Sequence, residues 1–135
     1  MRLRGGFLGF ASGPTVLIVA AGRQLVRDLS ELLLRAGYKV DIASEVVGQT
    51  NVLTAAQLVI LFSFKSFWTI GETYKICSTI RRNAPRLPIV VVGSDDVNTK
   101  VKLFELGADD YLPESFDHQE FLARVKALVN RNLGI

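Results

Sequence analysis

Short, uninterrupted apolar runs separate longer segments of helical periodicity along most of this chain. The clearest runs are VLIV at 16–19, LVILF at 58–62 and IVVV at 89–92, and none of them alternates with polar residues. Alternation is typical of a strand with one solvated face, whereas a continuous apolar run is typical of a strand covered on both faces. These runs therefore predict a parallel sheet with helices packed against each side.

The segments between these runs complete a strand–helix pattern that repeats five times. We expect two further strands at 38–42 and 110–112, and helices at about 24–35, 46–55, 72–83, 98–106 and 118–130. Gly37 and Gly107 are placed to end two of the helices, and Asp117 is placed to cap the last one. The predicted fold class is α/β, a doubly wound five-stranded parallel sheet, in which ligands bind beyond the carboxyl ends of the strands.

Composition excludes several function classes. The 135 residues suit one domain, and 49% of them are hydrophobic while 21% are charged, which favours a packed core. The net charge of +3 is scattered without a basic run, so this chain is not expected to bind nucleic acid itself. A single cysteine, Cys77, allows no internal disulfide and indicates a cytoplasmic protein, and no apolar run is long enough for a membrane span.

The first thirteen residues, MRLRGGFLGFASG, differ from the rest in being rich in glycine and arginine. Two interpretations stay open for residues 1–13: an N-terminal arm that packs on the surface, or a leader that is foreign to the domain. Residues 14–135 are predicted to form the domain.

The block GADDYLPESFDHQEFLARVKALVNR, at 107–131, resembles the end of a response-regulator receiver domain. The segments VLIVAAGRQLVRDLSELLLRAGYKV, AQLVIL and PIVVVGSDD match the same family in order, so the resemblance covers about 15–131. The subfamily it most resembles carries a winged-helix output domain that binds DNA. The resemblance implies a flavodoxin-like receiver fold and a role in two-component signalling, with an output domain following Ile135 if this chain is a fragment.

The resemblance also implies which residues would carry out phosphoryl transfer. Receiver domains hold Mg²⁺ with two acidic residues after the first strand, and they accept the phosphoryl group on an aspartate that ends the third. A threonine or serine after the fourth strand and a lysine after the fifth stabilise its charge. The matching positions here are Ala20, Ala21, Phe62, Gly93 and Glu114.

These substitutions predict a pseudo-receiver with no enzymatic activity, no metal and no cofactor. The first functional hypothesis is a phosphorylation-independent signalling and interaction module of an atypical response regulator. The second is a sensor that binds a small apolar ligand among Ala20, Ala21, Phe62 and Gly93 and thereby shifts Tyr111. Phe62 either fills the lost pocket or is an ordinary core residue, and Tyr111, which matches the switch aromatic of the family, lies either inward or on the surface.

In the winged-helix subfamily, the last two helices and the fifth strand form a two-fold dimer face with charged pairs around an apolar patch. The resemblance therefore predicts a homodimer. The apolar candidates are Val101, Phe104 and Leu122, and the charged positions that match are Lys100, Asp109, Asp110, Glu120, Arg124 and Arg131. The alternative is a solvated charged face.

The loop SFKSFWTIGE, at 63–72, departs furthest from the family pattern. Phe64, Phe67 and Trp68 follow one another closely in it. They form either a partner site or a cluster that packs back onto the domain. The acidic pair Asp95 and Asp96 is expected to cap the following helix rather than to bind metal.

Overall fold

The computed structural model describes residues 13–20, 24–44, 50–63 and 69–134 of the chain. Strands and helices alternate along them, which confirms the predicted pattern. In order they are β1 (Thr15–Val19), α2 (Gln24–Arg35), β2 (Lys39–Ala43), α3 (Thr50–Ala55), β3 (Leu58–Ser63), α4 (Ile70–Asn83), β4 (Ile89–Gly93), α5 (Val97–Glu105), β5 (Asp110–Pro113) and α6 (His118–Leu133).

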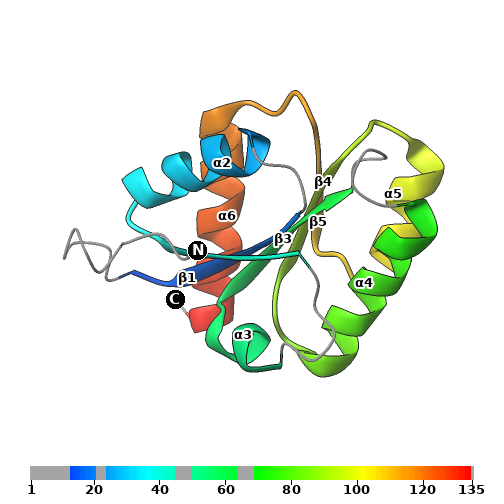
Figure 1. Ribbon diagram of the computed structural model, residues 1–135, viewed down its shortest axis with the longest axis horizontal. Helices are drawn as coiled ribbons and strands as arrows, with labels where there is room; N and C mark the ends of the chain where they lie inside the picture. The colour runs from blue at the N-terminus through cyan, green and yellow to red at the C-terminus, as the bar shows by residue number, and fades with distance from the viewer. Residues whose placement is uncertain (1–12, 21–23, 45–49, 64–68, 135) are drawn as a thin grey trace.

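The five strands form one sheet in the order β2-β1-β3-β4-β5, and every neighbouring pair is parallel. The central strand, β3, is buried at all six of its positions, as its continuous apolar sequence predicts. Because all the strands run the same way, their carboxyl ends meet at one edge of the sheet (Figure 1). The fold class predicted from the sequence is therefore confirmed.

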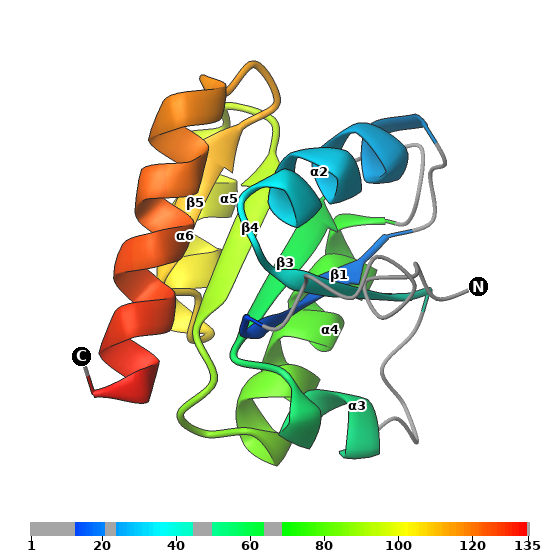
Figure 2. The same cartoon turned by 90° about the vertical axis from the view of Figure 1, so that its left-hand side faces the viewer.

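Helices cover both faces of the sheet: α2 and α6 lie on one face, and α3, α4 and α5 lie on the other (Figures 1 and 2). Each face has its own buried cluster, and neighbouring residues of a strand contribute to opposite clusters. On β3, for example, Ile60 belongs to the α2–α6 cluster and Leu61 to the α3–α5 cluster. This alternation fixes the face to which each residue at the carboxyl edge belongs.

Helix α4 begins two residues earlier than the sequence pattern predicts, because a capping box extends it. The Thr69 Oγ1 atom accepts a hydrogen bond from the Glu72 amide at 3.1 Å, and a Glu72 carboxylate oxygen accepts one from the Thr69 amide at 2.8 Å. These two bonds satisfy amide donors that the first turn of a helix otherwise leaves unpaired. The predicted helix at 46–55 is observed from Thr50, since residues 45–49 lie outside the described part of the chain.

The last helix begins as predicted, with the Asp117 carboxylate accepting a hydrogen bond from the Glu120 amide at 2.9 Å. It continues three residues beyond the predicted end, to Leu133. There Gly134 adopts a left-handed conformation with φ of +78° and closes the helix.

Cys77 of α4 is fully buried in the α3–α5 cluster, as expected for a small apolar residue. Burial raises the pKa of its thiol to about 11, so the thiol stays protonated at neutral pH. No helix in the described ranges has the combination of length and apolar character needed to cross a membrane.

Candidate functional site

The carboxyl edge of the sheet holds the described positions that match the phosphoryl-transfer residues of receiver domains. Ala20 follows β1, while Phe62 and Gly93 lie at the ends of β3 and β4, and all three are buried. Glu114 follows β5 and is exposed to solvent. Ala21 lies outside the described residues.

Phe62 is part of the protein core. It is fully buried and belongs to the α2–α6 cluster, together with Ala20, Leu112 and Phe121. Burial of a phenylalanine side chain stabilises a fold by roughly 1.5–3 kcal/mol. The residue at the phosphoacceptor position is thus an apolar packing residue, which offers no oxygen to a phosphoryl group or a metal ion.

Gly93 lies against the opposite face of the sheet, where it leaves space for Tyr111. A Cβ atom added at Gly93 would lie 2.7 Å from the Tyr111 hydroxyl oxygen and 3.1 Å from the Ser63 Cβ. Tyr111 is 8% exposed and belongs to the α3–α5 cluster. The tyrosine hydroxyl therefore occupies the space that any side chain at residue 93 would need.

The position of Tyr111 is held by polar contacts as well as by packing. Its hydroxyl donates a hydrogen bond to the Ser94 carbonyl oxygen at 2.6 Å, and the Lys100 ammonium lies 5.7 Å from the ring centroid. Burial raises the pKa of the Tyr111 phenol, while its hydrogen bond to Ser94 lowers this pKa. The negative charges of nearby acidic groups, chiefly Asp96, raise it further. The neutral phenol is thus the form that fits this site.

The sheet therefore divides the described site residues into two groups. Ala20 and Phe62 pack towards α2 and α6, while the Cβ direction of Gly93 faces Tyr111 and the α3–α5 side. The pairing of Ser63 with Gly93 across β3 and β4 fixes this division, because Phe62 precedes Ser63 and must face the other way. The ligand pocket of the second hypothesis would need both groups and Ala21, so it stays a prediction.

The other polar groups at this edge have structural partners. The Ser63 hydroxyl donates to the Thr73 hydroxyl oxygen at 3.3 Å, and the Asp96 carboxylate caps α5 by accepting a hydrogen bond from the Thr99 amide at 3.1 Å. Asp95 forms an ion pair with Lys100 at 2.7 Å. Within the described ranges, no three histidine, cysteine, aspartate or glutamate side chains come together as a possible metal site.

The charged residues of the predicted dimer face lie along α5, β5 and α6, and most of them are paired within the chain. Arg124 binds both carboxylate oxygens of Asp110, at 3.0 and 2.8 Å, and a carboxylate oxygen of Glu120 at 2.7 Å. Arg131 pairs with Asp109 at 2.8 Å. Hydrogen bonds to Asp110 and Glu120 raise the pKa of Arg124. The monomer thus already balances these charges.

An exposed apolar stripe runs along α5. Val97, Val101 and Phe104 are 68%, 51% and 46% exposed, and their spacing places them on one side of the helix. Val97 was not assigned to the apolar patch from the sequence. Its spacing of four residues from Val101 and seven from Phe104 is nevertheless the spacing of one helix face. The third predicted patch residue, Leu122, is half-buried against the α2–α6 cluster.

Arg81, near the end of α4, is a structural residue that was not identified from the sequence. Its guanidinium donates to the carbonyl oxygens of Pro85, Leu87 and Gly107 at 2.8, 2.9 and 2.6 Å. It also pairs with Asp109 at 3.0 Å. Arg81 therefore connects the α4–β4 loop with the turn before β5 and positions the acid that Arg131 binds. The predicted aromatic loop residues Phe64, Phe67 and Trp68 lie outside the described residues.

Comparison with known proteins shows what this sequence and this fold are similar to. The chain is 33% identical over 119 residues to the transcriptional regulatory protein PcoR of Escherichia coli, and 30% identical over 117 residues to the response regulator MprA of Mycobacterium avium. Each match covers 86% of this chain and 51% of the relative. A solved response regulator of Thermotoga maritima, 22% identical, superposes with a TM-score of 0.71 over 87% of this chain and 98% of that one. The chain has the fold of a response-regulator receiver domain and is similar in sequence to response regulators.

No family model matches the sequence. The chain spans about half the length of the curated relatives it matches. The similarity to the solved structure supports the receiver fold, whose five-stranded parallel sheet agrees with the observed order of strands.

Proposed function

We propose that this receiver domain signals without phosphorylation, as a non-enzymatic pseudo-receiver that acts through protein contacts. The observation that carries the proposal is the full burial of Phe62 in the α2–α6 cluster at the end of β3. Phosphoryl transfer needs an oxygen nucleophile and groups that stabilise negative charge. The described positions that match this chemistry supply two buried apolar side chains, a glycine and one exposed glutamate.

The place of Tyr111 supports a single, fixed state. In the family that the sequence resembles, this aromatic residue moves inward on activation. Here it is inward and bonded to the Ser94 carbonyl without any phosphoryl group, in the space that Gly93 leaves. We infer that the substitution at residue 93 replaces phosphorylation as the factor that holds Tyr111.

A phosphorylation assay tests this proposal directly. Incubation of the chain with acetyl phosphate or beryllofluoride and Mg²⁺ is expected to cause no increase in mass and no shift in Tm, because the position that matches the phosphoacceptor is the buried Phe62 and no described position that matches a charge-stabilising residue carries a hydroxyl or a cation. Mass spectrometry and thermal denaturation are the measurements. A receiver domain with an aspartate at the matching position is the positive control, and a stoichiometric mass increase in this chain would overturn the proposal.

We further propose that the chain forms a homodimer through α5, β5 and α6. The exposed stripe of Val97, Val101 and Phe104 supports this. Association becomes favourable when a second copy covers a contiguous apolar surface, because that surface is removed from water. The pairs made by Arg124 and Arg131 belong to β5 and α6 of the proposed face and are satisfied in the monomer, so we expect them to set the orientation of the partner more than its affinity. Contact with DNA, which the resemblance to the winged-helix subfamily implies, would belong to an output domain.

Substitution within the stripe tests the dimer without breaking an ion pair. Val101→Lys is expected to convert a dimer to a monomer in analytical ultracentrifugation at about 100 times the dimer Kd, since two lysines would then meet near the two-fold axis. The matched control is Ile42→Lys, because Ile42 is 42% exposed on the edge strand β2 and lies outside the proposed face. A monomeric wild type, or equal dissociation of both variants, would contradict the assignment.

A further inference from the structure

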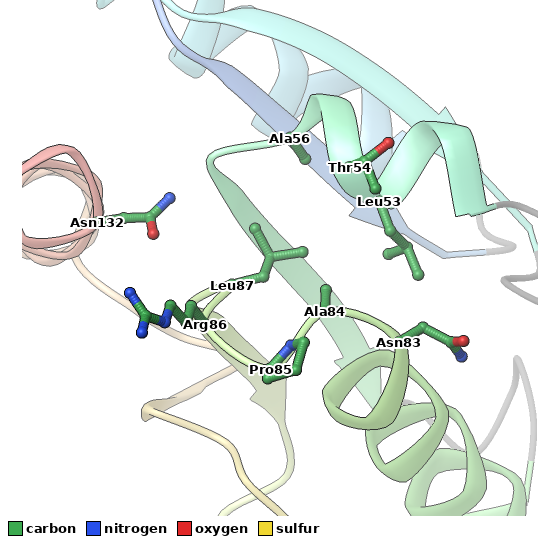
Figure 3. A pocket seen from close by; sticks show the side chains of 9 residues that line it. All are labelled: Leu53, Thr54, Ala56, Asn83, Ala84, Pro85, Arg86, Leu87 and Asn132. Atoms are coloured by element: carbon green, nitrogen blue, oxygen red, sulfur yellow. The ribbon is translucent and has the colours of Figure 1, made fainter.

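A pocket of about 410 Å³ opens at the end of the sheet opposite Phe62 and Gly93 (Figure 3). It lies where β3 and β4 begin, between the end of α3, the α4–β4 connection and the last turn of α6. This volume falls within the range of ordinary small-molecule sites, about 300–1,000 Å³. None of the residues that match receiver chemistry lines it.

The apolar part of the pocket is continuous with the protein core. Leu53, Ala56 and Leu87 line it, and all three belong to the buried α3–α5 cluster. Ala84 and Pro85 extend the apolar wall along the α4–β4 connection. Figure 3 shows Leu87 in the middle of the lining, with Ala56 and Leu53 across from it. An apolar group that enters here would gain contact with the core.

The polar part of the pocket is positively charged. Arg86 lines it beside Asn132, is exposed, and makes no hydrogen bond or ion pair with any residue that the structure describes (Figure 3). No lining residue is acidic. The neighbouring Arg81 is already paired with Asp109, so the free positive charge at the mouth is that of Arg86.

One amide side chain adds a donor beside Arg86. Asn132 donates through its Nδ2 atom to the Gln57 carbonyl oxygen at 3.2 Å, and the second hydrogen on this nitrogen is left available. Asn83 lies across the lining from Arg86 (Figure 3), and its amide donates to the Thr79 carbonyl oxygen at 2.8 Å. A guanidinium with one amide donor beside an apolar wall suits an anionic head group on an apolar body.

We propose that this pocket binds a small amphiphilic anion, with a carboxylate or phosphate on Arg86 and an apolar body against Leu87 and Leu53. The site is separate from the carboxyl edge of the sheet, so this proposal does not depend on the pseudo-receiver function. It adds a ligand site at an end of the fold where neither the sequence pattern nor the family resemblance predicts one.

An NMR titration of the isotope-labelled chain tests the proposal, with phenylbutyrate and phenyl phosphate as probes. Both are expected to cause saturable shifts of the amides at 53–56, at 83, 84, 86 and 87, and of Asn132. The neutral phenylbutanamide, which has the same apolar body as phenylbutyrate, is expected to bind about tenfold more weakly. The tighter of the two anions identifies the preferred head group, and the proposal holds with either.

Two variants and one control distinguish binding in the pocket from nonspecific electrostatic attraction to the protein surface. Arg86→Gln is expected to weaken phenylbutyrate binding about tenfold. Arg82→Gln removes the same charge from an exposed neighbour outside the lining and is expected to change binding less than about twofold. Thr54→Trp, at an exposed lining position of α3, is expected to fill the mouth and abolish binding.

Several outcomes would overturn the proposal. The absence of saturable shifts, equal binding of the neutral amide, or equal weakening by Arg82→Gln and Arg86→Gln would each show that the pocket does not recognise an anion. Shifts confined to the α5 stripe would place the binding elsewhere.

Discussion

Arg81→Met is expected to lower the free energy of unfolding by about 3 kcal/mol, which corresponds to a fall in Tm of about 10 °C. Methionine keeps an unbranched apolar stem but removes the guanidinium that binds four backbone carbonyls and Asp109. Two of its carbonyl partners, at Leu87 and Gly107, then lose a charge-assisted donor. Chemical denaturation measures the change.

The next residue in the sequence supplies the control. Arg82 is exposed, and its hydrogen bond to the Thr79 hydroxyl is long, at 3.5 Å, so Arg82→Met is expected to cost less than about 0.5 kcal/mol. Arg81→Lys is expected to fall between the two, because an ammonium keeps the charge but lacks the planar fork of donors. Equal effects at residues 81 and 82 would show that the network does not contribute as described.

Gly93→Thr restores the type of residue that receiver domains carry at this position, and it is expected to destabilise this chain by about 2 kcal/mol. The new Cβ would meet the Tyr111 hydroxyl at 2.7 Å and the Ser63 carbonyl oxygen at 3.0 Å. Either the strands shift or Tyr111 leaves its site and gives up its hydrogen bond to Ser94. Thermal and chemical denaturation measure the cost.

A double-mutant cycle assigns this cost to the Tyr111 contact. In a Tyr111→Ala background, Gly93→Thr is expected to lose most of its effect, since the tyrosine no longer fills the space. If Gly93→Thr lowers the free energy of unfolding equally in both backgrounds, the destabilisation comes from the contact with Ser63 rather than from the contact with Tyr111.

The titration of Tyr111 is a second measure of its displacement. In the wild type, burial raises the pKa of this phenol above its usual value of about 10, so its neutral form contributes stability below that pH. This contribution is lost as the pH rises through the folded-state pKa. In Gly93→Thr the pKa is expected to fall back towards 10, as followed by ultraviolet absorbance against a Tyr111→Phe reference.

The sequence predicted the fold well because the relevant signals are local. Apolar runs and helical periodicity located every strand, and they placed α2 at its observed bounds, Gln24–Arg35. The start of α4 was wrong by two residues because the Thr69 and Glu72 capping box was overlooked, although its T-x-x-E spacing is visible in the sequence.

The candidate site was less predictable because it depends on how separate strands pair. The sequence correctly indicated that Phe62 and Gly93 come to the same edge of the sheet. That their side-chain directions face opposite clusters follows only from the register that pairs Ser63 with Gly93. Arg81 has no sequence signal of its own either, because its partners are backbone carbonyls from a loop and a turn that meet only in the folded chain.

The burial of Phe62 bears on which single substitutions this chain tolerates. An aspartate at that position would place a carboxylate in an apolar cluster, which is costly by itself. A threonine at Gly93 would collide with the Tyr111 hydroxyl. Each residue of the receiver type would therefore destabilise the fold when introduced alone, so phosphate chemistry could be installed in this chain only by several substitutions made together.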